Sequence, residues 1–328
     1  MKNLHQFLGI AAMLFSFGAQ AQLSGSYAIG GVSPDYATLV EAIDSLKTNG
    51  ISAAVVFNIR DGVYDEQIAI NEVIAGASSA NTITFQSEAN DSTAVTILYS
   101  GGNEVLSLHN TSHLVFKNIS FYAPTYFGAY LSDCTNLRFE SVSLTGNISN
   151  TYYLFYSAYC TDLVLHQSTF SGSGSYGINA SGDNHTGWEI TDCTFADLND
   201  RAIYVYDLES LLVRGNTVNL GTANARGIYV EYCESPVIEG NEFNLQGPYQ
   251  RGVYLYSGQG STVDDNTIHI SGQYSYGIEV YSNQTVISNN TLTVAGEGSD
   301  AIYTSSTGGV IRDNTVTITA NGVDAIYA

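Results

Sequence analysis

The chain has 328 residues, with 31 acidic and 10 basic side chains and a net charge of −21 at pH 7. This excess of negative charge argues against a nucleic-acid or anionic-membrane binder, because both partners present phosphate groups that proteins meet with Lys and Arg. The length would suit two average domains, but a repeat protein grows by adding coils and remains one domain.

The first 21 residues have the three parts of a secretory signal peptide. Lys2 supplies the positive end, an apolar core runs from Phe7 to Phe17, and Ala19-Gln20-Ala21 matches a small-x-small cleavage site. No later segment contains the roughly 18 apolar residues that a membrane span requires. We therefore expect a protein that is secreted or held at the cell surface, with a mature chain that begins at Gln22.

An amphipathic helix is predicted from Tyr36 to about Lys47, with Asp35 as its cap and Asn49-Gly50 at its end. Its apolar face comprises Leu39, Ile43 and Leu46. The end of a stack of strands exposes apolar side chains and unpaired backbone. We expect this helix to cover that end, within an N-terminal region of cap and first coils that spans residues 22–104.

A buried strand from Ala53 to Ile59 comes next, followed by the turn Arg60-Asp61-Gly62 and a second strand from Gln67 to Ile70. The order of helix, strand and Gly-x-Tyr-x-Glu over 62–66 resembles the first segment of pectin methylesterases and related enzymes. The resemblance brings no catalytic residues with it, because the motifs of the esterase site are not found in the later coils.

Regular coils are predicted over residues 105–328, and from Arg201 onwards the repeat has a period of 24 to 25 residues. Each period holds three short runs in which apolar and polar residues alternate, as they do in β-strands; the first period has them at 203–205, 212–214 and 217–220. A repeat of this length indicates stacked units that bury their apolar faces against their neighbours.

The corner between the second and third runs ends on asparagine in five successive periods. These residues are Asn216, Asn241, Asn266, Asn290 and Asn314. Asparagine tolerates the left-handed backbone conformation of a tight corner, and its amide can bond to the same amide one coil away. We predict a buried asparagine ladder.

Three strands per coil of 23–26 residues, an asparagine corner and stacked Ile, Val and Phe resemble the right-handed parallel β-helix of secreted bacterial pectate lyases and their relatives. The fold class is therefore predicted to be all-β. The main alternative is a leucine-rich repeat, whose spacing is met by Leu208, Leu211, Val213, Asn216 and Val218. The next period carries Cys233, Pro236 and Phe243 at those places, which favours the β-helix.

Aligned coils give columns of equivalent residues. The first inward column is Phe116, Phe139, Leu165, Ile190, Val213, Ile238, Val263, Ile287 and Ile311. The second is Phe121, Leu144, Phe170, Phe195, Val218, Phe243, Ile268, Leu292 and Val316. Cys134, Cys160 and Cys233 share a corner column, and Cys193 precedes the asparagines. We favour free thiols, with a Cys134–Cys160 bridge as the alternative.

The last residues, from Asp324 to Ala328, reach one strand into a new period without a polar cap. An open end invites edge pairing. We therefore expect further domains on the C-terminal side, in a longer surface protein.

The outward face of the first run is the main candidate site. Its aromatic and acidic residues are Tyr204, Tyr206, Tyr229, Glu231, Tyr254, Tyr256, Glu279, Tyr281 and Tyr303, edged by Arg201, Arg226 and Arg251. Tyrosine rings offer flat faces to sugars and arginines pair with carboxylates. Since aromatic pairs also stabilise sheets without any ligand, sheet packing is the alternative interpretation.

A second column carries charge on the next run. It consists of Arg214, Glu239, Asp264, Ser288 and Arg312, with Asp265 and Asp313 at the adjoining corner. Glu239 and Asp264 lie one coil apart, like a retaining glycosidase pair, and the acids Asp264, Asp265 and Asp313 are candidate calcium ligands. A solvated charge ladder is the interpretation that we favour.

A third group, His166, Asp183, His185 and Asp192, combines histidines with acids near the irregular middle of the chain. Such a combination suits acid–base chemistry. No serine or cysteine nucleophile stands in a recognisable motif beside it.

Two function classes stay open. We favour a non-catalytic segment of a larger extracellular protein, adhesin-like, with polysaccharide binding on the tyrosine and arginine residues, because near-identical coils do not gather different groups at one point. The alternative is a polysaccharide lyase, glycoside hydrolase or pectin-esterase-like enzyme that acts on acidic glycans. No cofactor is expected apart from the option of calcium, and no nucleic-acid partner.

Overall fold

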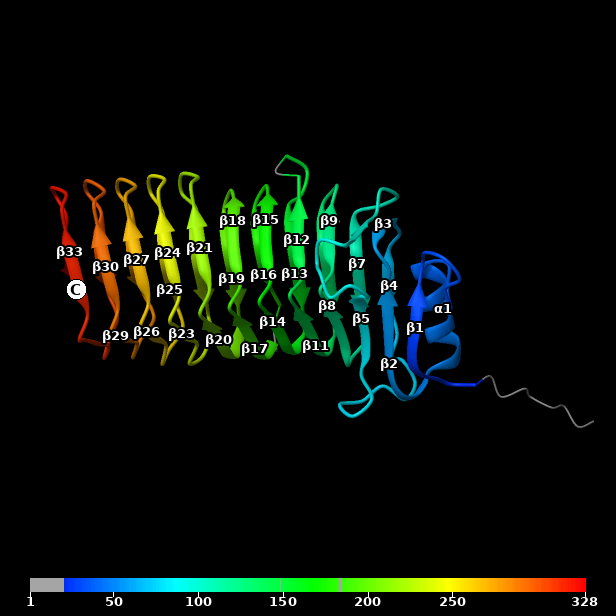
Figure 1. Cartoon of the computed structure of the whole chain (residues 1–328). Helices are drawn as coiled ribbons and strands as arrows, with labels where there is room; N and C mark the ends of the chain where they lie inside the picture. The colour runs from blue at the N-terminus through cyan, green and yellow to red at the C-terminus, as the bar shows by residue number, and fades with distance from the viewer. Residues whose placement is uncertain (1–20, 148, 183–184) are drawn as a thin grey trace, which may run out of the picture.

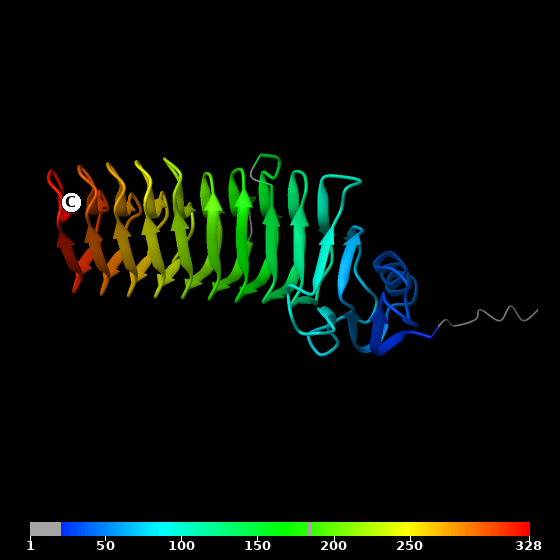
Figure 2. The ribbon, with the colours of Figure 1, turned by 45° about the horizontal axis from the view of Figure 1, so that its top comes forward.

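A computed structural model describes residues 21–147, 149–182 and 185–328 of the chain. The strands stack into one elongated solenoid, as Figures 1 and 2 show. The predicted signal peptide, apart from Ala21, lies outside the described residues. Within the described part of the chain, no helix has both the length and the apolar character needed to cross a membrane.

Three parallel sheets run along the solenoid, and each coil contributes one short strand to each sheet. Sheet A contains β1 (Leu23–Ile29), β2 (Ile51–Ile59), β5 (Ile83–Ser87), β8 (Leu114–Lys117), β11 (Thr135–Glu140), β14 (Thr161–His166), β17 (His185–Thr191), β20 (Leu208–Arg214), β23 (Val237–Glu239), β26 (Thr262–Asp264), β29 (Val286–Ser288) and β32 (Val310–Arg312).

Sheet B contains β3 (Gly62–Asp65), β6 (Val95–Leu98), β9 (Ser120–Ala123), β12 (Ser143–Gly146), β15 (Thr169–Ser173), β18 (Thr194–Leu198), β21 (Thr217–Leu220), β24 (Glu242–Leu245), β27 (Thr267–Ile270), β30 (Thr291–Val294) and β33 (Thr315–Ile318). Sheet C contains β4 (Ile68–Ile70), β7 (Glu104–His109), β10 (Phe127–Ser132), β13 (Tyr153–Ala158), β16 (Tyr176–Ala180), β19 (Arg201–Tyr206), β22 (Arg226–Glu231), β25 (Arg251–Tyr256), β28 (Tyr276–Val280), β31 (Asp300–Thr304) and β34 (Ile326–Tyr327).

The predicted parallel β-helix is confirmed, and the leucine-rich repeat is excluded because the described repeats contain three strands and no helix. In-register pairing places equivalent side chains one above another, for example Val213, Ile238 and Val263. Both inward columns are buried over most of their length, whereas Ile311 and Val316 near the end of the stack are only partly buried. The core is therefore a continuous apolar column inside the coils.

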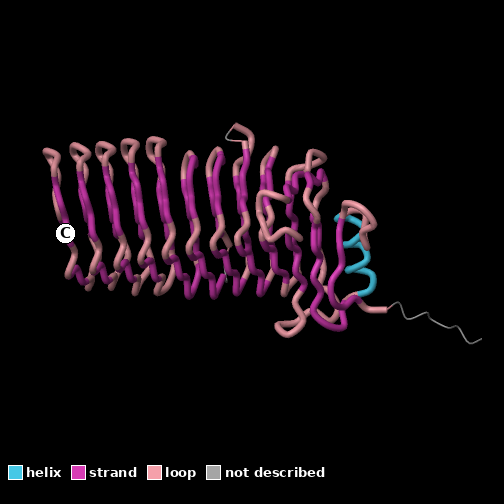
Figure 3. Tube along the Cα trace, viewed as in Figure 1, coloured by secondary structure: helices cyan, strands magenta, loops and turns pink. Residues whose placement is uncertain are grey.

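The helix α1 (Leu39–Asn49) lies at the N-terminal end of the stack, as predicted (Figures 1 and 3). The predicted start was wrong. Thr38 is the cap, because its hydroxyl accepts the Glu41 N–H at 3.1 Å while the Glu41 carboxylate accepts the Ala37 N–H at 2.8 Å. Asp35 instead accepts the Ala28 N–H at 2.7 Å.

The end of α1 and its buried face agree with the prediction. Gly50 ends the helix with a positive φ of 62°, and Leu39, Ile43 and Leu46 are buried. The strand β1, which pairs with β2 as the first strand of sheet A, was not predicted. Its sequence alternates too weakly to stand out, and only the pairing with β2 defines it.

The asparagine ladder is confirmed. Each amide from Asn216 to Asn290 donates to the Oδ1 atom of the next asparagine at 2.9–3.0 Å, and each backbone N–H in the same set also donates to that Oδ1 atom at 2.9 Å. Asn216 to Asn290 are at most 1% exposed. Cys193 stands in the same column, since its backbone N–H donates to Asn216 at 2.9 Å.

The prediction that these asparagines adopt the left-handed backbone conformation was wrong by one residue. The left-handed conformation belongs to the residue before each of them: Gly215, Gly240, Asp265, Asn289 and Asp313, with φ between 53° and 67°. The ladder amide is thus selected for its hydrogen bonds, and the preceding residue for its backbone. This also gives Asp265 and Asp313 a turn-forming role.

The four cysteines are free and buried. Cys134 and Cys160 lie in one column, where the Cys134 N–H donates to the Cys160 Sγ atom at 3.4 Å. A hydrogen bond to the Cys160 sulfur, together with burial, raises the pKa of the Cys134 thiol. The preferred interpretation of packed thiols therefore agrees with the structure.

Candidate functional site

The outward side chains of β19, β22, β25, β28 and β31 form a surface that we call the tyrosine face. Register places Tyr204, Tyr229 and Tyr254 directly above one another, then Glu279 and Tyr303. Ring centroids of the first three are 5.1 and 4.7 Å apart. Eight of the predicted residues therefore lie on strands of sheet C, namely Arg201, Arg226, Arg251, Tyr204, Tyr229, Tyr254, Glu279 and Tyr303.

The aromatic surface continues into earlier coils, which the sequence reasoning missed. These residues are Phe127, Tyr130, Tyr153, Tyr156 and Tyr176 on β10, β13 and β16, with stacked pairs such as Phe127–Tyr153 at 5.4 Å and Tyr153–Tyr176 at 5.0 Å. The early periods are less regular, so their tyrosines do not recur at a constant spacing. The equivalent positions of these residues in the strands from β10 to β22 are the signal that could have found them.

The three arginines stack on tyrosine rings. The guanidinium carbon of Arg201 lies 4.7 Å from the Tyr204 centroid, that of Arg226 lies 5.1 Å from Tyr229, and that of Arg251 lies 5.3 Å from Tyr254. Such cation–π contacts hold the side chains along the sheet. The arginines are thus part of the packing of this face.

Two of these arginines also have acidic partners. Arg201 lies 3.7 Å from Asp200 and donates to the Tyr176 hydroxyl at 2.6 Å, and Arg251 forms an ion pair with the buried Glu279. Arg226, between them, makes no ion pair with any described residue. Its buried Nε atom, like that of Arg201, has no hydrogen-bond partner among those residues. Arg226 is therefore the arginine of this face that forms no direct ion pair with a described residue.

Burial raises the pKa of Tyr204 and Tyr229, and the neighbouring Glu231 carboxylate raises each of them further. Tyr204 donates to Glu231 at 2.9 Å, and Tyr281 donates to Glu279 at 2.9 Å. Burial followed by the charge of Glu279 likewise raises the pKa of Tyr254. The hydroxyls stay protonated at neutral pH and act as hydrogen-bond donors.

The charged column of sheet A is internally satisfied. Glu239 forms an ion pair with Arg214, and the Asp264 carboxylate accepts from Ser288 at 2.6 Å and from Asn289 at 2.8 Å. Asp313 contacts Arg312 at 2.9 Å. In the described part of the chain, no group of three or more His, Cys, Asp or Glu side chains is arranged to hold a metal ion.

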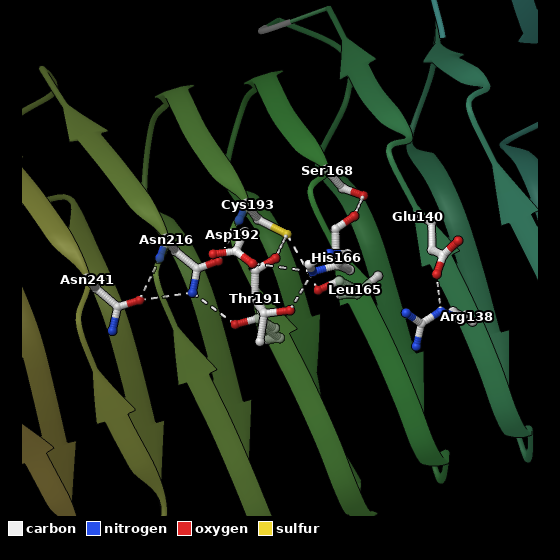
Figure 4. A network of polar contacts seen from close by, with 11 residues as sticks. Arg138, Glu140, Leu165, His166, Ser168, Thr191, Asp192, Cys193, Asn216 and Asn241 are labelled. Atoms are coloured by element: carbon white, nitrogen blue, oxygen red, sulfur yellow. Dashed lines mark hydrogen bonds and ion pairs between the residues drawn. The ribbon is translucent and has the colours of Figure 1, made fainter. Parts of the chain in front are cut away.

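The histidine group is only partly assembled. His166 and Asp192 come together, with 3.5 Å between the His166 Nδ1 atom and the carboxylate, and the same nitrogen lies 2.9 Å from the Thr191 hydroxyl (Figure 4). Asp183 lies outside the described residues. His185 is at the start of β17, and nothing further is assigned to it.

The comparisons with known proteins agree with this fold. The family described as Right handed beta helix region matches residues 177–328, and the family described as Periplasmic copper-binding protein (NosD) matches residues 48–221. A search of curated proteins finds no match.

Solved structures share the architecture at low identity. A lacto-N-biosidase from Eubacterium ramulus has 10% identity and a TM-score of 0.57 over 92% of this chain and 68% of its own. The ORF18 protein of Geobacillus virus E2 has 12% identity and a TM-score of 0.49 over 86% of this chain, which spans 58% of the viral protein.

The pectate lyase Pel9A has 12% identity and a TM-score of 0.47 over 94% of this chain and 80% of its own. The likeness to the lacto-N-biosidase shows the fold and nothing about activity. Since the NosD match covers just over half of the sequence, the protein is a right-handed parallel β-helix that belongs to the family described as Periplasmic copper-binding protein (NosD).

Proposed function

We propose that this protein is an exported, non-catalytic β-helix that binds an acidic polysaccharide on the tyrosine face. The observation that carries the proposal is Arg226, a positive charge without an acidic partner among the described residues, in a chain of net charge −21. A carboxylate of the ligand would supply the missing counter-charge. The sequence predicted three equivalent arginines in the binding surface. We propose that Arg226 is the main one that anchors the ligand.

The tyrosines support the same proposal. Their rings repeat at the spacing of the coils, about 4.8 Å, which is close to the length of one sugar unit. A polysaccharide lying along the solenoid would meet one ring per coil. The opposing interpretation, sheet packing alone, accounts for the rings and for the cation–π contacts of Arg226. It gives the Arg226 charge no acidic partner among the described residues.

Affinity electrophoresis in pectin and alginate gels tests the proposal. Arg226→Gln should weaken retardation by about tenfold, because a charge-assisted hydrogen bond is lost. Arg312→Gln is the matched control, since it removes the same charge from sheet A. Higher salt should weaken binding of the wild type. Equal retardation of the Arg226 variant and the wild type would overturn the proposal.

The catalytic alternative has less support. Glu239 and Asp264, the candidate acid pair, are engaged by Arg214 and by Ser288. Release of reducing ends or unsaturated uronides from pectin or alginate, abolished by Asp264→Ala and unaffected by Arg226→Ala, would establish it over our proposal.

The family description names copper, and the described residues do not fit that metal. Copper sites use thiolate, thioether or imidazole ligands. All four cysteines are buried, and burial raises the pKa of Cys193 to about 12. The histidines of the described residues join no group of three or more His, Cys, Asp or Glu side chains that could hold a metal ion. Both methionines, Met1 and Met13, precede the described residues. We assign no copper chemistry to this chain, and we propose only that it shares the exported location.

A further inference from the structure

A second candidate site lies on a different sheet from the tyrosine face. The outer face of sheet A has a shallow hollow of about 350 Å³ beside His166. It spans β11 to β20, where Figure 4 shows Arg138 and Glu140 on one side of His166 and Thr191 with Asp192 on the other.

The hollow exists because the charged column of sheet A is interrupted there. Before it, Lys117 pairs with Glu140 at 3.3 Å, and after it, Arg214 pairs with Glu239. Between these pairs the column holds His166 and Thr191, which bond to each other at 2.9 Å. Neither side chain is long enough to reach across the surface, so the space above them stays open.

Hydrogen-bond donors line both ends of the hollow. Arg138 lies at one end and Arg214 at the other, and each contacts its glutamate through the Nε atom. The terminal nitrogens of a guanidinium group remain available for other acceptors when only Nε is engaged.

Acceptors lie between the two arginines. Glu189 is exposed, and its side chain makes no hydrogen bond or ion pair with any described residue. Asp192 contributes a second carboxylate beside His166. Val164 and Leu212 flank Glu189 on the neighbouring strands and give the hollow two apolar surfaces.

We propose that this hollow binds one or two units of a neutral saccharide. Donors and acceptors that alternate around small apolar surfaces match the hydroxyl groups and C–H faces of a sugar. An anion such as phosphate would face the carboxylates of Glu189 and Asp192, and a cation would face Arg138 and Arg214. The volume lies at the lower end of the usual range for ligand pockets, roughly 300–1,000 Å³.

Saturation-transfer NMR with methyl glucoside, methyl galactoside and methyl mannoside tests this site on the full chain. We expect transfer to at least one glycoside, and binding about tenfold weaker in Glu189→Ala, because a carboxylate acceptor is lost. Glu242→Ala, an exposed acidic residue on sheet B, is the matched control and should bind like the wild type.

The site is independent of the tyrosine face, so Arg226→Gln should leave the glycoside signals unchanged. The proposal would be overturned by no transfer to any of the three glycosides, by equal binding of Glu189→Ala and the wild type, or by tighter binding of methyl glucuronide than of methyl glucoside. Loss of the signals in Arg226→Gln would also overturn it, because the binding would then belong to sheet C.

Discussion

The corner between sheets A and B is built in two ways in the two halves of the solenoid. In the coils of β8 and β11 it holds Ile119 and Val142, which are buried apolar side chains. In the coils from β20 onwards it holds the asparagine ladder, whose amides are buried and bonded to each other. The same corner position therefore accepts either a buried apolar side chain or a hydrogen-bonded amide.

The backbone is the same in both halves. The residue before the corner has a positive φ throughout, for example 52° at Asn118, 51° at Ser141 and 67° at Gly215. A buried amide at this corner is stable only where the coils above and below supply its hydrogen-bond partners. The side chain that the corner can hold therefore depends on the neighbouring coils. Ser168 and Cys193 occupy the transition between the two solutions, and both are buried.

The core also differs between the halves. Early coils stack large rings, such as Phe85–Phe116 at 5.6 Å and Phe116–Phe139 at 5.1 Å. Later coils place Val213, Ile238 and Val263 in the same column. Early coils thus rely on aromatic packing, whereas later coils add repeated hydrogen bonds to a smaller aliphatic core.

Alkaline pH should cause the largest loss of stability, and the loss should occur in both halves of the solenoid. Burial raises the pKa of Tyr153 and Tyr176 in the early coils and of Tyr204 and Tyr229 in the later ones above 10.0. Folded tyrosines then keep protons that unfolded ones lose. Stability is complete below pH 10 and falls as pH rises through the folded pKa values.

Ultraviolet titration together with hydrogen exchange resolved by region measures this alkaline transition. Tyr229→Phe should make the loss of stability less steep, because one titrating group is removed. If the later coils opened at a much lower pH than the early ones, the tyrosines of sheet C would differ between the two halves as well.

Phe139→Ala should give the largest loss among single substitutions, about 3–5 kcal/mol of unfolding free energy, because it leaves a cavity between stacked rings. Val316→Ala, a partly buried residue in the same kind of inward column, is the control and should cost far less. Denaturant unfolding followed by circular dichroism gives both values. Similar losses of unfolding free energy in the two variants would mean that packing in the core stabilises the early coils no more than the late ones.

Asn266→Leu should cost about 1–3 kcal/mol, because the Asn241 amide and backbone N–H lose their acceptor. Asn314→Leu should cost less, since Asn314 is only partly buried. Thermal unfolding compares the two variants. A Tm for the Asn266 variant equal to that of the wild type would contradict the ladder's contribution to stability.

Cys193→Asn should have the smallest effect, within about 0.5 kcal/mol of the wild type. The new amide would extend the ladder by one coil, because Asn216 already accepts from the Cys193 backbone N–H. Ile119→Asn is the matched contrast, since Val142 on the next coil offers the new amide no side-chain acceptor and the buried polar group would be destabilising. Equal losses in the two variants would show that the ladder cannot be extended.

The periodicity of the sequence is sufficient to predict the solenoid. A period of 24 to 25 residues with three alternating runs fixes which side chains point inward, because strand side chains alternate faces and in-register coils stack like on like. The inward columns, the asparagine ladder and the alignment of Tyr204, Tyr229 and Tyr254 all follow from that periodicity. Even the position of the cap helix followed from its apolar face and from the glycine that ends it.

The way in which neighbouring coils share their polar groups is visible only in the folded chain. Aligned sequences made Arg201, Arg226 and Arg251 equivalent, yet the residues around them differ. Asp200 and Glu279 therefore engage the outer two, and Arg226 is left without an ion pair among the described residues. The contact of His166 with Asp192 and the hollow beside it likewise depend on three-dimensional neighbours. Periodicity specifies a column, but charge pairing depends on distances and side-chain directions between coils, which the repeat alone does not contain.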